Sequence, residues 1–305
     1  MVDNSSHIST KERAEYFQSV HLWPLMEDLN YDGWLKNFKG NDELEIATKL
    51  LDFFLFYSKN TVNQLLRTSV SNSGYLFLNY FNNWKHEDFK NRCYYSYIPG
   101  ESPNPSDSGL RFINKVRDEF DIPQSRLLMY EELFTKLVNP KIEPLAVILV
   151  DDFIGSGDQL CHAWGSQHEL YGVTLDEIVK KGNHCVVYAP LIVNKKSREK
   201  IKKYCKHLHI SFAHTINDEY NLFKENCYCW ENNKELYKRG IKLILKKSRE
   251  LGIPFSNGRK TIDVRGYKKQ GLALSFEHGT PDATLPIFYW KDEGWTPLIK
   301  RRYEK

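Results

Sequence analysis

The first ninety residues carry apolar side chains at the spacing of helices. Apolar and aromatic residues dominate positions 45–57, with Lys49 and Asp52 left for an outer face, and they return at helical spacing over 60–70. No recognisable catalytic motif stands in this stretch. The pattern predicts a helical N-terminal extension over residues 1–90.

From residue 93 onward, short apolar runs alternate with amphipathic stretches. The pattern predicts strands at 93–100, 145–150, 185–193 and 209–216, and helices at 110–120, 195–206 and 233–251. Such alternation is typical of a doubly wound parallel sheet, in which ligands bind beyond the carboxyl ends of the strands. We therefore expect an α/β core over residues 91–252. The β-prone runs TIDVRGY, LALSFEHGT and TLPIFYW predict a β-rich segment over 253–305.

Composition favours a globular protein. The chain has 305 residues, of which 41% are hydrophobic and 14% aromatic, which argues against disorder. No apolar run approaches the roughly 18 residues that cross a bilayer, and the first residues lack the apolar segment of a secretory signal. Six cysteines in so long a chain make no disulfide framework. We expect a cytoplasmic protein without a membrane partner.

Positive charge is concentrated in the second half of the chain. The first 150 residues carry 16 Lys and Arg against 20 Asp and Glu, whereas the remainder carries 27 against 19. A basic surface can bind nucleic acid, or it can simply be solvated. The basic positions are Lys195, Lys196, Arg198, Lys200, Lys202, Lys203 and Lys206, followed by the stretch 242–249 and by 300–302. No recognisable DNA-binding motif accompanies them, and solvated faces are the preferred interpretation.

The most informative segment of the sequence is VILVDDFIGSGDQL, residues 147–160. An apolar strand delivers Asp151 and Asp152 to its carboxyl end, and a turn with Gly155 and Gly157 precedes a predicted helix. Glycines let backbone N–H groups surround a phosphate, and a helix N-terminus adds its positive dipole end. The carboxylates can accept hydrogen bonds from ribose hydroxyls or position Mg²⁺ through water. The pattern indicates a site for a phosphorylated sugar.

Three other interpretations compete with this one. A Walker-B strand also ends in acids, but no GxxxxGK[ST] motif precedes it. A receiver domain also places paired acids after a strand, but it gives no reason for the immediate Gly-Ser-Gly turn. In an ordinary strand-turn-helix unit, the acids would merely cap the helix.

The segment of residues 147–160 resembles the phosphoribosyl-pyrophosphate (PRPP) signature of type I phosphoribosyltransferases. The resemblance implies a type I phosphoribosyltransferase-like α/β fold, a parallel sheet flanked by helices, with a helical N-terminal extension and a β-rich C-terminal hood. It implies that Asp151 and Asp152 anchor the ribose, act as the catalytic pair and hold Mg²⁺ through water. The 5′-phosphate loop would then be Gly155, Ser156, Gly157, Asp158 and Gln159.

The loop departs from the family pattern in ways that bear on catalysis. Gly155 stands where purine-salvage members carry an acid proposed as general base, and Gln159 replaces a second hydroxyl residue. Asp158 adds a negative charge beside the phosphate position. Binding of a PRPP-type ligand is therefore compatible with changed or absent transfer chemistry, and activity as a pentosyltransferase stays open.

Two further segments extend the resemblance. In the parent family, the loop after the first core strand binds pyrophosphate, and a hood contributes the base pocket. The pyrophosphate-loop candidates are Gly100, Glu101, Ser102, Ser106, Ser108 and Arg111, with an exposed loop as the alternative. The hood candidates are His278, Thr280 and Asp282, with a plain hairpin turn as the alternative. A zinc site is rejected, because the one-residue spacing of Cys227 and Cys229 is unusual for a zinc knuckle.

Three segments resemble the phosphoribosyltransferase-like proteins of bacterial anti-phage conflict systems, some of which are encoded beside retron reverse transcriptases. These segments are GESPNPSDSG, FEHGTPDATLPIFYW and GWTPLIKRR. The resemblance implies a protein that binds PRPP or a related phosphoribosyl ligand with Mg²⁺, as an effector or accessory component of defence. The alternative is a catalytically inactive nucleotide sensor or scaffold that docks a nucleic-acid-containing partner such as a reverse transcriptase complex. A purely structural scaffold would bind no ligand.

Overall fold

The computed structural model describes residues 4–25, 27–100, 108–139, 141–256 and 262–301. Packing divides the chain into two compact units. Unit 1 joins the two ends of the sequence, Met1–Val62 and Asn217–Lys305, and unit 2 is the continuous stretch Asn63–Ile216. Within the described residues, no helix combines the length and the apolar character that crossing a bilayer requires.

Unit 2 is built on a parallel sheet. The strands lie in the order β2-β3-β4-β5, and β6 also pairs with β4. Their bounds are β2 (Tyr94–Ser96), β3 (Ala146–Ile154), β4 (Cys185–Asn194), β5 (Leu208–Ile210) and β6 (His214–Ile216). All four strand pairs are parallel. The carboxyl ends of β2, β3 and β4 therefore meet at one edge, where such sheets bind ligands.

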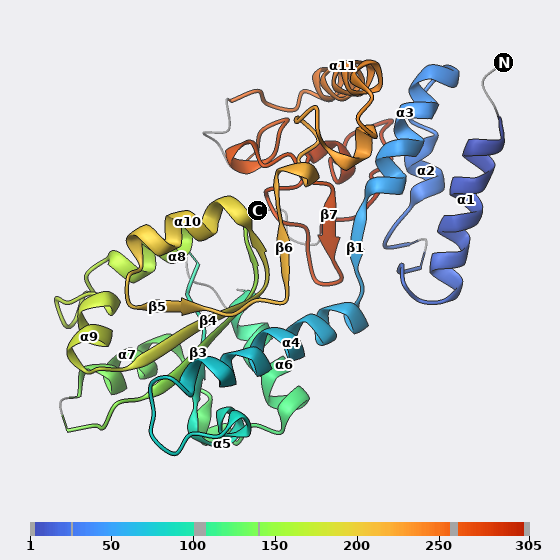
Figure 1. Ribbon diagram of the computed structural model, residues 1–305. Helices are drawn as coiled ribbons and strands as arrows, with labels where there is room; N and C mark the ends of the chain where they lie inside the picture. The colour runs from blue at the N-terminus through green and yellow to red at the C-terminus, as the bar shows by residue number, and fades with distance from the viewer. Residues whose placement is uncertain (1–3, 26, 101–107, 140, 257–261, 302–305) are drawn as a thin grey trace. The chain divides into compact units, whose positions relative to one another are not determined.

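Helices cover both faces of this sheet. Figure 1 shows α8 and α10 on one side of the strands and α4 and α6 on the other. The bounds are α4 (Lys59–Phe77), α5 (Phe89–Arg92), α6 (Ser108–Phe120), α7 (Tyr130–Val138), α8 (Asp158–Gly165), α9 (Leu175–Lys181) and α10 (Lys195–Tyr204), with 3-10 turns η1 (His86–Asp88) and η2 (Gln124–Arg126). Strands covered on both faces are continuously apolar, as every residue of β4 is buried. The predicted fold class, a mixed α/β fold with parallel strands flanked by helices, is confirmed.

Unit 1 is mostly helical, with one pair of parallel strands. Its elements are α1 (Asn4–Ser19), α2 (Tyr31–Leu35), α3 (Gly40–Phe53), β1 (Leu55–Tyr57), η3 (Asp218–Tyr220), η4 (Tyr228–Trp230), α11 (Lys234–Glu250), η5 (Tyr267–Lys269), β7 (Leu274–Phe276) and η6 (Pro286–Phe288). Strands β1 and β7 pair in parallel although more than 200 residues separate them. The core of this unit contains Trp34 from the first stretch of chain and Trp230 from the second, both fully buried.

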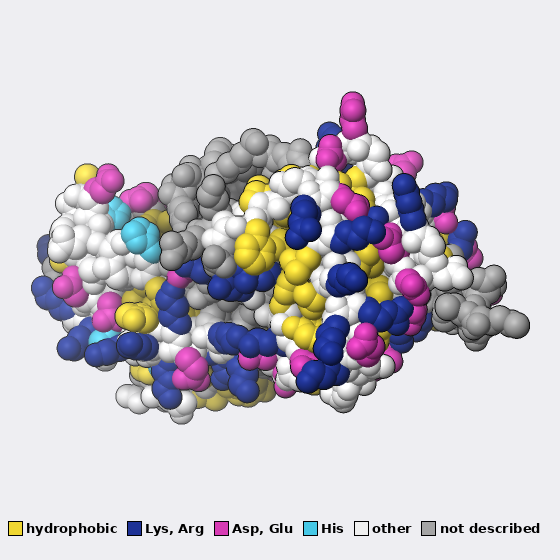
Figure 2. Space-filling view, turned by 90° about the horizontal axis from the view of Figure 1, so that it is seen from above, with side chains coloured by type: hydrophobic (Ala, Val, Ile, Leu, Met, Phe, Trp, Pro, Cys, Tyr) yellow, Lys and Arg dark blue, Asp and Glu magenta, His cyan; other side chains and the backbone are white. Residues whose placement is uncertain are grey.

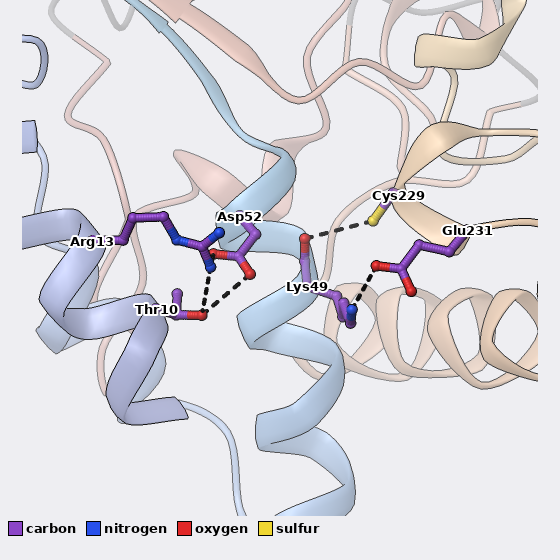
Figure 3. Close-up of polar contacts among 6 residues, drawn as sticks. All are labelled: Thr10, Arg13, Lys49, Asp52, Cys229 and Glu231. Carbon is purple, nitrogen blue, oxygen red and sulfur yellow. Dashed lines mark hydrogen bonds and ion pairs between the residues drawn. The ribbon is translucent and has the colours of Figure 1, made fainter. Parts of the chain in front are cut away.

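Polar contacts join both stretches of unit 1 to helix α3, as Figure 3 shows. On one side, Asp52 accepts hydrogen bonds from the guanidinium of Arg13 (2.8 Å) and from the hydroxyl of Thr10 (3.2 Å). On the other, the Lys49 ammonium lies 2.6 Å from the Glu231 carboxylate, and the Cys229 thiol lies 3.7 Å from the Lys49 carbonyl oxygen. Helix α3 therefore links α1 to η4 and to Glu231, the residue after it.

Several stretches differ from the sequence-based prediction, and the strand predicted over residues 209–216 is divided into β5 and β6. The helix predicted over residues 45–57 ends at Phe53, because the next residues form β1 and pair with β7. In the tail, the described residues of TIDVRGY and TLPIFYW form turns, and only LALSFEHGT contains a strand. Pro286 begins the 3-10 turn η6, and a proline has no N–H to donate to a sheet. The predicted three-part division of the chain, 1–90, 91–252 and 253–305, stays a prediction.

Candidate functional site

The two acids of the central motif lie near the carboxyl end of β3. The strand continues to Ile154, beyond the predicted end at Val150, so the acids are strand residues. Asp151 is buried, with 7% of its surface exposed, and Asp152 is half-buried. The Asp152 N–H donates to Asp151 Oδ1 (2.9 Å) and the Phe153 N–H to Asp152 Oδ1 (2.8 Å). The sheet therefore fixes both carboxylates at this edge.

Tyr188 of β4 is a partner of this pair that the sequence did not reveal. Its hydroxyl donates to Asp151 Oδ2. Leu149 and Tyr188 are neighbours in the β3–β4 register, as are Asp151 and Pro190, so Tyr188 reaches Asp151 along one face of the sheet. Burial, followed by the negative charge of Asp152, raises the pKa of Asp151 well above its usual range. Asp151 therefore holds its proton more tightly than an exposed aspartate does.

The turn after β3 has the geometry of a helix start. Gly157 has φ +73°, a left-handed conformation that other residues adopt only with strain, and it stands immediately before α8. A Cβ at this position would lie 3.4 Å from side-chain atoms of Ser197 and Ile201 on α10, so the turn runs close to that helix. The Ser156 hydroxyl donates to Asp158 Oδ2 (2.9 Å) and accepts from the Asp158 N–H (3.2 Å).

Lys200 compensates the additional negative charge of this turn. Its ammonium forms an ion pair with Asp158 Oδ1, and both side chains are about one-third exposed. The sequence placed Lys200 among the solvated lysines of a basic helix, because nothing in a linear pattern shows which lysine faces the turn. The structure separates it from its neighbours Lys202 and Lys203, which are exposed.

The turn after β3 also contacts the segment that follows β2. The Gln159 amide donates to the Pro99 carbonyl oxygen at 3.1 Å. Pro99 and Gly100 lead into the predicted pyrophosphate loop, so the last residue of the predicted phosphate loop contacts the segment where the pyrophosphate loop begins. Arg111 is half-buried on α6. Of the remaining loop candidates, Glu101, Ser102 and Ser106 lie outside the described residues, as does the side chain of Ser108.

The hood candidates form a turn in unit 1, directly after β7. His278 is 5% exposed and stacks on Phe276, with ring centroids 5.1 Å apart. The Thr280 hydroxyl lies 2.8 Å from that of Ser275. Asp282 forms an ion pair with Arg301. Each of these side chains therefore has a contact inside unit 1.

The acid pair fits the requirements of magnesium. Mg²⁺ keeps several waters and binds through one or two carboxylates together with substrate phosphates. Asp151 and Asp152 supply such carboxylates beside a turn suited to phosphate. Among the described residues, no group of three or more His, Cys, Asp or Glu side chains is assembled for a metal ion. A magnesium ion here would therefore depend on oxygen ligands from a bound phosphate and from water.

Comparison with known families assigns the chain to a family. The family model PRTase-CE matches residues 31–301, which include both the acid pair and the turn after β7. The chain belongs to the PRTase-CE family. This confirms the predicted resemblance to phosphoribosyltransferase-like proteins, and the match covers parts of both units of this PRTase-CE protein.

Other comparisons add little to the family assignment. No curated protein matches the chain. Among solved structures, the AQ2163 protein from Aquifex aeolicus is 14% identical, and the alignment covers 57% of this PRTase-CE chain and 84% of that chain with a TM-score of 0.29. A similarity of this size does not establish a common fold.

The basic residues of the second half divide into two groups. On α10, Lys195, Lys196 and Arg198 are exposed. On α11, Lys246 and Lys247 instead pair with Glu43 of α3, at 2.7 and 3.0 Å. Figure 2 shows Lys and Arg side chains interspersed with Asp and Glu on the face seen from above. Part of the positive charge therefore serves internal ion pairs.

Replacing Asp151 by Asn is expected to stabilise the protein at neutral pH. Because the folded-state pKa of Asp151 is raised, its contribution to stability is complete below the ordinary aspartate pKa of about 3.9 and is lost as the pH rises through the raised value. The amide stays neutral at every pH. We expect Asp151→Asn to increase the free energy of unfolding at pH 7 and to change it little at pH 4, measured by denaturant titration.

The control for this measurement is Asp121→Asn, which changes an exposed aspartate of the same unit. It should leave stability within about 0.5 kcal/mol at both pH values. An Asp151→Asn protein that is less stable than the wild type at pH 7 would contradict the raised pKa of the buried Asp151 carboxyl.

Proposed function

We propose that this protein binds PRPP or a related phosphoribosyl ligand, together with Mg²⁺, at the carboxyl edge of the sheet in unit 2. The observation that carries the proposal is the placement of Asp151 and Asp152 at the end of β3, directly before a turn that opens α8 with Ser156 and a left-handed Gly157. Carboxylates bind sugar hydroxyls, and a glycine turn at a helix N-terminus binds phosphate. The family assignment supports the same ligand class.

In this proposal, the two acids contact the ribose and the turn after β3 contacts the 5′-phosphate. The half-buried Asp152 accepts hydrogen bonds from the ribose, while Asp151, held by Tyr188, positions it. Ser156 and the backbone N–H groups of the turn bind the 5′-phosphate, and Lys200 supplies positive charge beside Asp158. Magnesium neutralises the phosphate charge when bound. If a transfer occurs, a nucleophile bonds to C1 of the ribose as the bond to pyrophosphate breaks, so positioning and charge stabilisation suffice for most of the chemistry.

We further propose that the ligand is used in bacterial anti-phage defence, as effector or accessory component. The support is the sequence resemblance of residues 100–109 and 276–290 to phosphoribosyltransferase-like proteins of conflict systems. Loss of protection against phage in cells that carry the Asp151→Ala, Asp152→Ala protein tests this role.

Calorimetry with Mg²⁺ and PRPP tests the ligand. The wild-type protein should bind PRPP in the presence of Mg²⁺, and the Asp151→Ala, Asp152→Ala protein should bind at least about 100-fold more weakly, because each lost charge-assisted contact removes roughly 1.5–3 kcal/mol. Release of pyrophosphate with candidate acceptors would then distinguish an enzyme from a sensor.

The matched control is Asp118→Ala, Asp121→Ala, which removes two exposed carboxylates from the same unit. It should bind PRPP like the wild type. Equal binding by the control and the Asp151, Asp152 variant, or absence of binding by the wild type, would count against the proposed site.

A second candidate function is a nucleotide sensor or scaffold that docks a partner containing nucleic acid, such as a reverse transcriptase complex. The exposed basic side chains of α10 favour it, since lysines and arginines on one helix can follow a phosphate backbone. Retention of RNA that falls steeply between low and high salt, and that is lost on Lys195→Glu, Lys196→Glu, would support it. Salt-independent retention would exclude backbone binding by this helix.

A further inference from the structure

Unit 1 contains a cavity of its own, apart from the residues assigned to PRPP. Its volume is about 320 Å³, within the range of small-molecule sites. Residues from four segments line it: positions 21, 23–25 and 28, after α1; positions 56, 58 and 59, from β1 to the first residue of α4; positions 275–277 and 279, in β7 and the turn after it; and positions 299–300. All four segments belong to unit 1.

Aromatic and aliphatic side chains form part of the wall. Trp23 is 9% exposed and lies edge-on to Phe17, with centroids 5.4 Å apart, which fixes the indole. Phe56 and Ser275 are neighbours in the β1–β7 register, so they share one face of this strand pair. The side chains of Trp23, Phe56 and Ile299 together give the cavity an apolar surface suited to a flat aromatic group.

Charged groups of both signs also line the cavity. Lys59 and Lys300 are exposed, and Asp28 and Glu277 are half-buried. Lys59 is the first residue of the 19-residue helix α4, so the positive end of that helix dipole adds to the two ammonium groups. An anionic group fits the lysines, whereas hydroxyl or amino donors fit the carboxylates.

One wall of the cavity lies outside the stretch that matches the family. The match begins at Tyr31, whereas the lining residues His21, Trp23 and Asp28 precede it. Helix α1, immediately before this wall, is attached to α3 by the bonds of Thr10 and Arg13 to Asp52 (Figure 3). Part of the cavity wall therefore comes from residues that precede the family match.

We propose that this cavity binds a nucleoside monophosphate. A nucleotide carries a group that can contact each part of the lining. Its flat base can pack against Trp23 and Phe56, and its phosphate can pair with Lys59 and Lys300. Its hydroxyl or amino groups can donate to the carboxylates. The inference does not rest on the proposed function, because no residue is shared between the two sites.

A substitution at Gly279 tests the site with little risk to the fold. Gly279 lines the cavity, and a Cβ placed there meets no atom within 4 Å. Gly279→Leu should therefore occupy part of the cavity and weaken nucleotide binding at least about tenfold. Gly165→Leu is the matched control, because Gly165 also has open space around it and lies outside the cavity. It should bind like the wild type.

The probes are AMP, GMP, CMP and UMP in calorimetry, with adenosine and ribose 5-phosphate as partial ligands. We expect at least one monophosphate to bind with a dissociation constant at or below about 0.1 mM, and each partial ligand to bind about tenfold or more weakly. Lys300→Ala should lower the affinity about tenfold, while Lys291→Ala, an exposed lysine outside the cavity, should not.

The proposal is overturned if no monophosphate binds up to about 1 mM, or if binding is the same in Gly279→Leu and Gly165→Leu. Binding that disappears in Asp151→Ala, Asp152→Ala but persists in Gly279→Leu would place the nucleotide in unit 2 and would also overturn it. Failure of PRPP to bind leaves the expected result for this cavity unchanged, so the two proposals fail separately.

Discussion

Replacing Lys200 by Glu is expected to weaken binding of Mg²⁺-PRPP by roughly 100-fold. In the wild type, the Lys200 ammonium pairs with Asp158 beside the proposed phosphate turn. In the variant, two carboxylates face the turn. Unit charges about 4 Å apart near a protein surface interact by about 4 kcal/mol before screening, and each 1.4 kcal/mol is tenfold in affinity. The partial exposure of the pair reduces this to about 2–3 kcal/mol.

The control for this prediction is Lys202→Glu, which makes the same charge change at an exposed position of α10. Calorimetry should show a less than about threefold effect there, because salt screens a solvated charge. Asp158→Asn should act in the opposite direction and tighten binding up to about tenfold, since it removes a negative charge from the turn. Equal losses in the two lysine variants would exclude a specific role for Lys200.

Replacing Trp230 by Ala is expected to lower the free energy of unfolding by about 3–5 kcal/mol. The Trp230 ring is fully buried in the core of unit 1, and its indole N–H donates to the Leu222 carbonyl oxygen at 2.9 Å. The ring also fills the space above Gly240 on α11, where a Cβ would come within 2.2 Å of it. Truncation leaves a large cavity and an unpaired carbonyl.

Denaturant unfolding combined with amide hydrogen exchange would measure this loss and locate it. Exchange should accelerate in the peptides of residues 1–62 and 217–305, because these form one packed unit. Tyr228→Ala is the control, since this residue of the same turn is 58% exposed. Its cost should stay below about 1 kcal/mol. A similar loss in both variants would contradict the central place of Trp230 in the core.

The candidate site was predictable where neighbouring residues carry the chemistry. The order of apolar strand, two acids and a Gly-Ser-Gly turn sufficed to predict that Asp151, Asp152 and Ser156 lie at the carboxyl edge of a parallel sheet. Tyr188 and Lys200 were missed, because their roles come from strand register and helix orientation. A tyrosine two residues before the register partner of Asp151 is a signal only when the β3–β4 pairing is known.

The sequence by itself determined the local elements and the family. Continuous apolar runs specified β3 and β4, because a strand covered on both faces has no polar side, and the motif of residues 147–160 specified the resemblance that the family match confirms. Only the tertiary structure decided that residues 55–57 leave the helical pattern to pair with β7, and that the two ends of the chain form one unit. Such pairings join segments more than 200 residues apart, and their energy comes from contacts that no local pattern encodes.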